Sequence, residues 1–504
     1  MEDGPHDTTL PDGVRVRLDR SVRVLDGGRA LIGGAPPRLL HLAPAAQAVL
    51  GHHRAVTVVD ATSRALARTL LDAGAAHPEY EPPSAVPGPS AVTVVVPVKD
   101  RTGGLARLLA ALPAGFGEVL VVDDGSADAG DVAAVAAEHS ARVLRHERSR
   151  GPAAARNTGL AAARTPLVAF LDSDVVPEPG WTGPLLAAFA DPAVGLAAPR
   201  IVALPPIEGW LGRFEAVRSS LDLGPDPALI VPRTRVAYVP SAALLVRAAA
   251  VGAGFAEDMH VAEDVDLVLR LHAAGWRLRY APSARVAHDH RTTAWAWWRR
   301  KAFYGTGAAP LALRHKGSVP PMVLSPWAAT VGAALLVARP WSAAVAVVTS
   351  AVAAERLARR LDRLDQPRTV AARLIALGAI GAAAQTADAV TRHHWPLAAV
   401  AALCSRRARR RIVAIAVGSA AIDWWRHRRR DPRVRPGLVP YVAARMLDDI
   451  GYGSGLWWGA LRHRTLAPLL PAGPGGPNSR PSGLLRKGVR SASPRADSAG
   501  AKRS

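Results

Sequence analysis

The sequence contains a single cysteine, Cys404, among its 504 residues. One thiol cannot form an intramolecular disulfide or a cysteine-based zinc site, and this scarcity is typical of a reducing compartment. The first thirteen residues, MEDGPHDTTLPDG, are acidic and contain no apolar run. We therefore expect no secretory signal peptide, and we expect the part of the chain that carries the motifs below to stay in the cytosol.

Acidic residues are also in short supply, because 41 Asp and Glu face 63 Lys and Arg, which gives a formal charge of +22. Such an excess could indicate a nucleic-acid binder. However, the arginines gather in 356–363, 406–411, 426–435 and the tail after Leu470, beside apolar segments and without interleaved aromatic residues. This distribution favours a membrane lipid as the partner, so no nucleic-acid partner is expected.

Residues 1–80 are expected to form a small module of their own. VRVRLDRSVRVL, at 14–25, alternates with period two like a hairpin strand, and helices are expected at 43–52 and 62–73. The pattern resembles winged-helix modules that bind peptide substrates in ribosomal-peptide maturation, which implies a peptide-binding role here. The alternative is an extension that only packs on the catalytic domain. Residues 81–90 are then a proline-rich linker.

Beyond the linker, the pattern alternates between strand and helix. Strands are expected at 92–98, 118–126 and 167–170, with helical stretches between them. Such alternation predicts an α/β fold with a Rossmann-like, mostly parallel sheet, which we expect over residues 91–317.

Acidic residues stand at the ends of all three strands. Asp100 follows the first, Asp123 and Asp124 end the second, and Asp172 and Asp174 follow the third. Ligands of open parallel sheets bind outside the carboxyl ends of the strands. Asp172 and Asp174 suit Mg²⁺ or Mn²⁺ that also holds a diphosphate, whereas a carboxylate after the second strand could accept hydrogen bonds from a uracil or a ribose. Taken alone, Asp172 and Asp174 are better explained as a solvated acidic turn, and the turn that Gly125 permits is an adequate structural reason for Asp123 and Asp124.

Two more groups lie between and after these strands. Gly151 and Pro152 are expected to open a helix whose free amides face an anion, and Arg156 one turn later could meet a diphosphate or simply pair with Asp172 or Asp174.

The second group, Glu263, Asp264 and Asp266, stands at the start of an amphipathic helix, where acidic residues also serve as caps. His288 follows and could reach a metal, although a lone histidine is more often a satisfied polar residue.

Taken in order, PVKDR, VVDDGS, RGPAAARNTGL, FLDSD and EDVDLVLRLHAAGW resemble the family 2 glycosyltransferases, which have the GT-A fold. The resemblance covers roughly residues 90 to 305. It implies that Asp123 and Asp124 hold the nucleoside, that Asp172 and Asp174 hold the metal and diphosphate, and that Asp264 is the catalytic base. To the donor site we also assign Pro97, Asp100 and Arg156, to the metal His288, and to the acceptor region Glu263, Asp266 and Trp298.

One departure from the family concerns processive synthesis. The Gln-x-x-Arg-Trp motif of processive polysaccharide synthases is missing, and its place is taken by residues 297–300, WWRR. This difference puts long processive polymerisation in doubt.

The chain also resembles one subgroup, the glycosyltransferases that decorate a redox cofactor made from a ribosomal peptide, the mycofactocin system. LPDGVRVRLDRSVRVL, LIGGAPPRLLHLAPAA, residues 156–177 and YVPSAALLVR carry this resemblance. It implies transfer of β-linked glucose from UDP-glucose to a peptide-derived acceptor. Deprotonation of the acceptor hydroxyl by Asp264 and attack opposite an α-linked diphosphate would invert the anomeric carbon.

Residues 318–470 are apolar and rich in alanine. Val319–Ala338 contains twenty residues without a charge, enough to span a bilayer, and shorter apolar stretches follow. We expect one or two spans plus interfacial or buried helices, with the active site on the cytoplasmic side of the cell membrane. The alternative is a helical bundle docked on the catalytic domain. Residues 471–504 are expected to be a disordered basic tail.

Two other functions remain open from the sequence. An enzyme of the same fold could place sugar on a polyprenyl phosphate or a cell-wall lipid, as the apolar region favours. A membrane-tethered binding protein with an inactive sugar site is disfavoured by the intact Asp172, Asp174 and Asp264.

Overall fold

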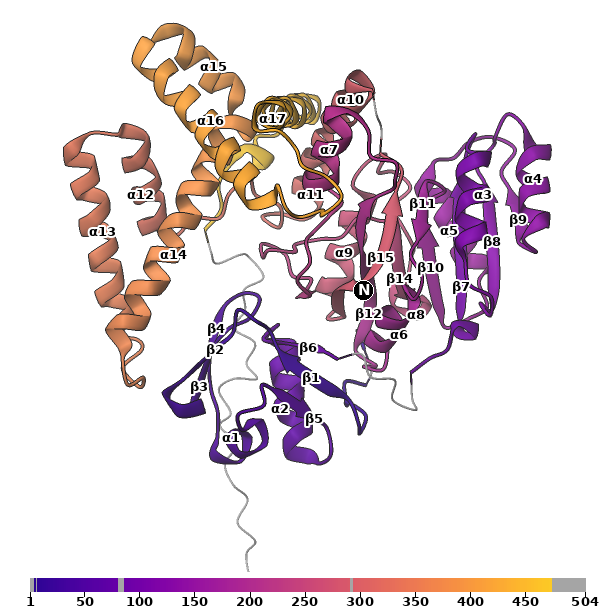
Figure 1. The fold of residues 1–504 in the computed structure, drawn as a ribbon, viewed down its shortest axis with the longest axis horizontal. Coiled ribbons are helices and arrows are strands. Elements are labelled where there is room, and N and C mark those ends of the chain that lie inside the picture. Colours follow the sequence, from indigo (N-terminus) through magenta and orange to yellow (C-terminus); the bar gives the residue numbers. More distant parts are fainter. Residues whose placement is uncertain (1–3, 6, 80–85, 291–292, 474–504) are drawn as a thin grey trace, which may run out of the picture.

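The structure is a computed structural model that describes residues 4–5, 7–79, 86–290 and 293–473 (Figure 1). The first half of the expected linker at 81–90 and nearly all of the expected tail lie outside the described residues.

The N-terminal module consists of two small antiparallel sheets and two helices. One sheet has the order β5-β1-β6 and the other β2-β3-β4. Asp60 begins the longer helix by accepting a hydrogen bond from the Ser63 amide at 2.7 Å, while Leu66, Leu70 and Leu71 of that helix fill the core. The bounds are β1 Arg15–Leu18, β2 Arg23–Leu25, β3 Ala30–Gly33, β4 Arg38–His41, α1 Pro44–Leu50, β5 Ala55–Thr57, α2 Ala61–Asp72 and β6 Ala76–Pro78.

The catalytic part is built on a nine-stranded mixed sheet. Its order is β11-β15-β12-β14-β10-β7-β8-β9, with β13 paired to β15. Strands β10, β7, β8 and β9 are parallel, and β14 runs opposite to both β10 and β12, so β12 points the same way as β10. The bounds are β7 Val92–Val98, β8 Glu118–Asp123, β9 Arg142–Arg145, β10 Leu167–Leu171, β11 Val175–Pro177, β12 Val194–Ala203, β13 Ala228–Leu229, β14 Ala243–Arg247 and β15 Arg277–His288.

Helices cover both faces of this sheet. Because side chains alternate along a strand, Val94 and Val96 of β7 point into one core and Val95 into the other. Leu105 of α3 packs in the first core, and Leu267 of α9 in the second. The bounds are α3 Thr102–Ala111, α4 Ala129–Glu138, α5 Pro152–Ala162, α6 Thr182–Ala188, α7 Gly209–Arg218, α8 Ala248–Val251, α9 Glu263–Ala273, α10 Ala294–Thr306 and α11 Ala308–Arg314.

The N-terminal module docks where β12 and β15 begin. Arg68 of α2 forms two hydrogen bonds with Asp191, at 2.7 and 2.9 Å, and Asp72 pairs with Arg277 at 2.9 Å. Since β12 and β10 run the same way, this is the amino end of the sheet. The module therefore lies at the end of the sheet opposite to the carboxyl ends of the central strands.

The C-terminal helices differ in part from expectation. Val319–Ala338 does not form one long helix, because the chain stays irregular through Pro320 and Pro321 and becomes helical only at Pro326. Among the described residues, two other helical segments are long and apolar enough to cross a membrane, Pro340–Ala358 and Pro367–His393. They indicate membrane association only weakly. The bounds are α12 Pro326–Val337, α13 Pro340–Ala358, α14 Pro367–Asp388, α15 Trp395–Cys404, α16 Arg406–His427 and α17 Leu438–Arg462.

Helix α17 joins these helices to the catalytic part by lying along α10. The two backbones approach so closely that a Cβ on Gly305 would clash with the Tyr452 carbonyl oxygen, and a Cβ on Gly455 would clash with the Ala302 carbonyl oxygen. This contact places residues of α17 beside the catalytic sheet.

Candidate active site

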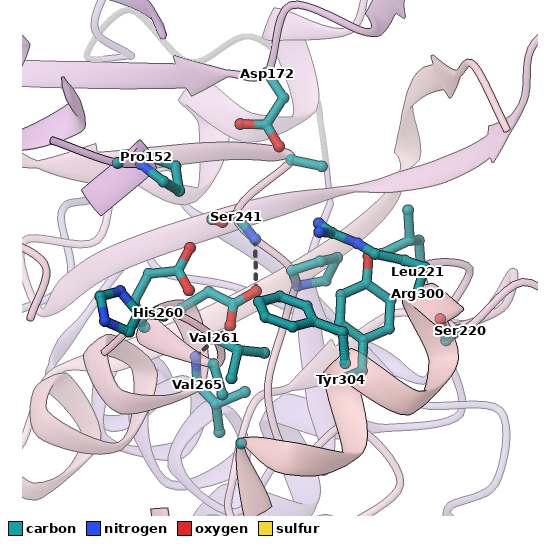
Figure 2. Close-up of a pocket in the computed structure, with 18 of the residues that line it drawn as sticks. Pro152, Asp172, Ser220, Leu221, Ser241, His260, Val261, Val265, Arg300 and Tyr304 are labelled. Atoms are coloured by element: carbon teal, nitrogen blue, oxygen red, sulfur yellow. Dashed lines mark hydrogen bonds between the residues drawn. The ribbon is translucent and has the colours of Figure 1, made fainter. Parts of the chain in front are cut away.

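A cavity of about 590 Å³ opens at the carboxyl ends of β7, β8 and β10 (Figure 2). It brings together residues that lie far apart in the sequence, from Pro97 to Tyr452. Eight of the residues selected from the sequence line it: Pro97, Asp124, Arg156, Asp172, Asp174, Glu263, Asp264 and His288.

Asp124 shapes one wall of the cavity. Its carboxylate accepts hydrogen bonds from the Ser149 hydroxyl at 2.7 Å and from the amides of Arg150 and Gly151 at 2.8 and 2.9 Å. Burial opposes ionisation, but these donors and His146 together lower the pKa of Asp124. Asp124 thus fixes the segment that leads into α5 at the cavity.

Asp123 and Asp100 are not among the residues that line the cavity. Asp123 is almost fully buried, accepts a hydrogen bond from the Ser126 amide at 2.9 Å and pairs with Arg145. Asp100 accepts one from the Ala127 amide at 2.8 Å. In these contacts both carboxylates brace the turn after β8.

Arg156 connects two acidic motifs inside the cavity. Its guanidinium is 2.6 Å from Asp172 and 3.0 Å from Glu263, and only 3% of its side chain is exposed. Burial by itself would lower the pKa of Arg156, but the charges of Asp172 and Glu263 outweigh it and raise that pKa. Arg156 therefore stays charged and holds both carboxylates in place.

Asp174 is the carboxylate best suited to a divalent cation. Its Oδ1 is buried without a hydrogen-bond partner and lies 3.6 Å from His288 Nε2, while Oδ2 pairs with Arg101 at 2.9 Å. Burial and the neighbouring Asp172 raise the pKa of Asp174 to about 6. Burial lowers the pKa of His288 to about 4, so its imidazole is neutral and able to bind a metal.

The Asp174 carboxylate and the His288 imidazole are suitable ligands for Mg²⁺ or Mn²⁺, but they would supply only part of its coordination shell. Within the described ranges, no group of three His, Cys, Asp or Glu side chains is arranged to hold a metal ion. A cation held by Asp174 and His288 would take its remaining ligands from diphosphate oxygens and water, as Mg²⁺ usually does.

Asp264, at the start of α9, lies in the same cavity. Its Oδ2 accepts a hydrogen bond from the Ser241 amide at 3.1 Å, drawn as a dashed line in Figure 2, and its Oδ1 accepts one from the Val265 amide at 2.8 Å. Burial and the charge of Glu263 raise the pKa of Asp264 to about 6. A fixed carboxylate with this pKa is suited to accept a proton near neutral pH.

Beside Asp264 the cavity has an aromatic wall that sequence reasoning missed, formed by Tyr238, Phe303, Tyr304 and Tyr452. Figure 2 shows Tyr304 and Arg300 on the side of the cavity opposite to Asp172. The Arg300 guanidinium lies 4.7 Å from the centre of the Tyr304 ring. The wall combines residues from α10, α17 and the loop before β14, so no single sequence motif could have revealed it.

Asp266 and Trp298, which the sequence placed in the acceptor region, do not line the cavity. The Asp266 carboxylate is fully buried against Arg270 at 2.9 Å and His315 at 2.7 Å. Trp298 stacks on Trp295 with ring centres 5.5 Å apart. Asp266 thus joins α9 to the residue that follows α11, and Trp298 packs against its neighbour on α10.

Comparison with known proteins defines the class. Residues 93–243 match the glycosyl transferase family 2. Over 473 residues, 92% of this chain and 98% of the relative, the sequence is 47% identical to the pre-mycofactocin glycosyltransferase of Mycobacterium tuberculosis strain H37Rv. The chain therefore belongs to the family 2 glycosyltransferases, and it is a glycosyltransferase with the GT-A-type α/β fold expected from its sequence.

Two further matches are more distant. The succinoglycan biosynthesis protein ExoU of Rhizobium meliloti is 30% identical over 226 residues, 40% of this chain and 62% of that protein. Among solved structures, a mannosyltransferase from Pyrobaculum calidifontis in complex with GDP-Man and Mn²⁺ is 20% identical, covers 61% of this chain and 90% of that one, and has a TM-score of 0.35.

Proposed function

We propose that this enzyme transfers glucose from UDP-glucose to pre-mycofactocin, a peptide-derived redox cofactor precursor, with inversion to a β linkage. The observation that carries this proposal is the 47% identity to a pre-mycofactocin glycosyltransferase along 92% of the chain, which includes regions outside the catalytic sheet. The presence of Asp174 and Asp264 in one cavity supports a single displacement between donor and acceptor.

In the proposed reaction, each side chain has a defined task. Asp264 accepts the proton of the attacking hydroxyl, and the amides of Ser241 and Val265 keep its carboxylate in position. Arg156 keeps Glu263 paired, so that the second carboxylate does not compete for the proton. A divalent cation held by Asp174 and His288 would supply charge neutralisation for the departing diphosphate.

The acceptor would lie against the aromatic wall. Tyr238 and Tyr304 line the same cavity as Asp264, and tyrosine faces bind both sugar rings and aromatic rings. A peptide-derived acceptor and a growing glucose chain could both use such a surface.

The position of the N-terminal module bears on its proposed peptide-binding role. The module is fixed by Arg68 and Asp72 at the amino end of the sheet, whereas Asp264 works at the other end, and the ten residues of β12 span about 33 Å. This geometry favours a packing role for residues 1–80 over direct presentation of the acceptor to Asp264.

The test is a transfer assay with purified full-length enzyme, UDP-glucose and pre-mycofactocin, with Mg²⁺, Mn²⁺ or EDTA. We expect a glucosylated product with β configuration by NMR, loss of transfer in EDTA and recovery with added metal. Transfer only to a polyprenyl phosphate would refute the acceptor, and the α product would refute inversion. Full activity in EDTA would exclude a metal role for Asp174.

A further inference from the structure

The hairpin of α13 and α14 exposes a large apolar surface, which the rest of the described chain leaves open. The exposed fractions reach 62% for Trp341, 68% for Val347 and 60% for Val348 on α13, and 58% for Ile380 on α14. Soluble monomers rarely expose contiguous apolar surface of this kind, so a lipid or protein partner is expected to cover it.

Arginines flank this apolar surface at both ends. At the tip, where α13 turns into α14, the exposed arginines are Arg356, Arg359, Arg360, Arg363 and Arg368, beside the acidic Glu355, Asp362 and Asp365. At the base, Arg411 of α16 donates to the carbonyl oxygens of Leu336 and Ala338, which brings the arginines of 406–411 next to the start of α13. Charge complementarity therefore points to an anionic bilayer.

The tip of the hairpin is anchored to the N-terminal module. Ala30 of β3 packs in one apolar cluster with Leu361, Leu364 and Ala371. Arg29 also pairs with Asp365 at 2.7 Å. That module in turn is tied to the catalytic sheet through the Arg68–Asp191 and Arg277–Asp72 pairs.

The base of the hairpin is anchored to the same catalytic part by another route. At the end of α14, Asp388 pairs with Arg445 of α17 at 2.9 Å. Helix α17 lies along α10, and Lys301 of α10 pairs with Asp448 of α17 at 3.4 Å. Figure 1 shows α12, α13 and α14 side by side, reaching from α16 down toward β3 and β4.

These two anchors decide how the hairpin can meet a bilayer. Helix α14 has 22 residues and is about 33 Å long, close to the thickness of the hydrocarbon core. If it crossed the membrane, its two ends would lie on opposite sides, yet both are fixed to one polar body that cannot enter the core. A crossing would also leave one arginine cluster on the outer side of the membrane, whereas Lys and Arg are usually enriched on the cytoplasmic side.

We infer that α13 and α14 lie in the plane of an anionic membrane surface and do not cross it. The exposed valines and Trp341 enter the boundary between headgroups and acyl chains, and the two arginine clusters contact lipid phosphates. The enzyme thereby binds one face of the membrane with its catalytic sheet, N-terminal module and hairpin tip all on the same side.

Cysteine labelling tests the side on which the tip lies. In a Cys404→Ser background, Arg363→Cys marks the tip and Glu138→Cys marks the catalytic part. Spheroplasts that produce each full-length variant are treated with a membrane-impermeant maleimide before and after lysis. We expect both cysteines to react only after lysis. Reaction at position 363 in intact spheroplasts, with position 138 protected, would show that the hairpin crosses and would overturn the inference.

Vesicle flotation tests the surface itself. The full-length protein should float with vesicles of phosphatidylcholine and phosphatidylglycerol, and much less with phosphatidylcholine alone. The double variant Val347→Ser/Val348→Ser should bind about tenfold more weakly or worse, since two exposed apolar side chains are lost. Val59→Ser, with a residue 71% exposed on the N-terminal module, is the matched control and should bind normally. Unchanged binding of the double variant, or no flotation of the parent protein, would refute the proposed surface.

Discussion

Arg156 donates a hydrogen bond to Glu263 at 3.0 Å and so ties α5 to the start of α9. Glu263 directly precedes Asp264, the proposed base. The same guanidinium reaches Asp172 at 2.6 Å. The buried guanidinium of Arg156 thus sets the positions of Asp172, on the proposed donor side, and Glu263, on the proposed acceptor side, relative to each other. The ion pairs of Arg156 are therefore one direct link between the two motifs.

Removal of Arg156 is therefore expected to affect both stability and catalysis. Arg156→Ala leaves Glu263 and Asp172 facing each other without their cation, which should cost about 3 kcal/mol of folding free energy. Urea unfolding measures this loss. Arg107→Ala removes a half-exposed partner of Asp289 and should cost less than about 1 kcal/mol. Equal losses for the two variants would contradict the coupling role.

Substitutions at Asp264 and Asp174 should separate chemistry from donor binding. Asp264→Asn keeps the shape but cannot accept a proton, so turnover should fall about a hundred-fold to ten-thousand-fold while UDP-glucose affinity changes little. Asp174→Asn should weaken metal-dependent donor binding as well as turnover. Calorimetry gives the affinity and product formation gives the rate. Near-normal turnover of Asp264→Asn would move the role of base to Glu263.

The pH dependence of turnover follows from the raised pKa of Asp264. The base works only when deprotonated, so the rate should fall about tenfold per pH unit below pH 6 and level off above it. Asp174 has a similar raised pKa and could give the same limb through metal binding. Rate profiles at two metal concentrations distinguish the two: a limb from Asp174 shifts to lower pH with more metal, whereas one from Asp264 stays in place.

The sequence was most informative where function depends on one short segment. The apolar run 167–170 and the carboxylates after it predict a strand with a site at its carboxyl end, because ligands of parallel sheets bind at that edge. The structure has β10 at Leu167–Leu171, and the cavity lies at its carboxyl end. The two helices of the N-terminal module also lie close to the expected positions, whereas the run 14–25 forms two strands, β1 and β2, that belong to different sheets.

Features that depend on packing between distant segments could not be predicted from local sequence patterns. Asp266 and Asp264 stand in the same acidic cluster at the start of α9. The Asp266 carboxylate, however, is fully buried and pairs with His315, the residue that follows α11. Val319–Ala338 satisfies a hydropathy window, yet its prolines keep the first part irregular. The approach of α17 to α10, which completes the aromatic wall, depends on glycines in both helices.

That wall gives the last prediction, which concerns the acceptor. Tyr304 lines the cavity near Asp264, whereas Trp295, on the same helix, is 65% exposed and outside it. Tyr304→Ala should raise the KM for the acceptor about fivefold to thirtyfold, because an aromatic contact contributes about 1 to 2 kcal/mol to binding, and should leave UDP-glucose affinity unchanged. Trp295→Ala should leave both constants close to those of the parent enzyme. If Tyr304→Ala weakened the donor and spared the acceptor, the aromatic wall would belong to the nucleotide, and the acceptor would have to enter the cavity from the side of Asp124.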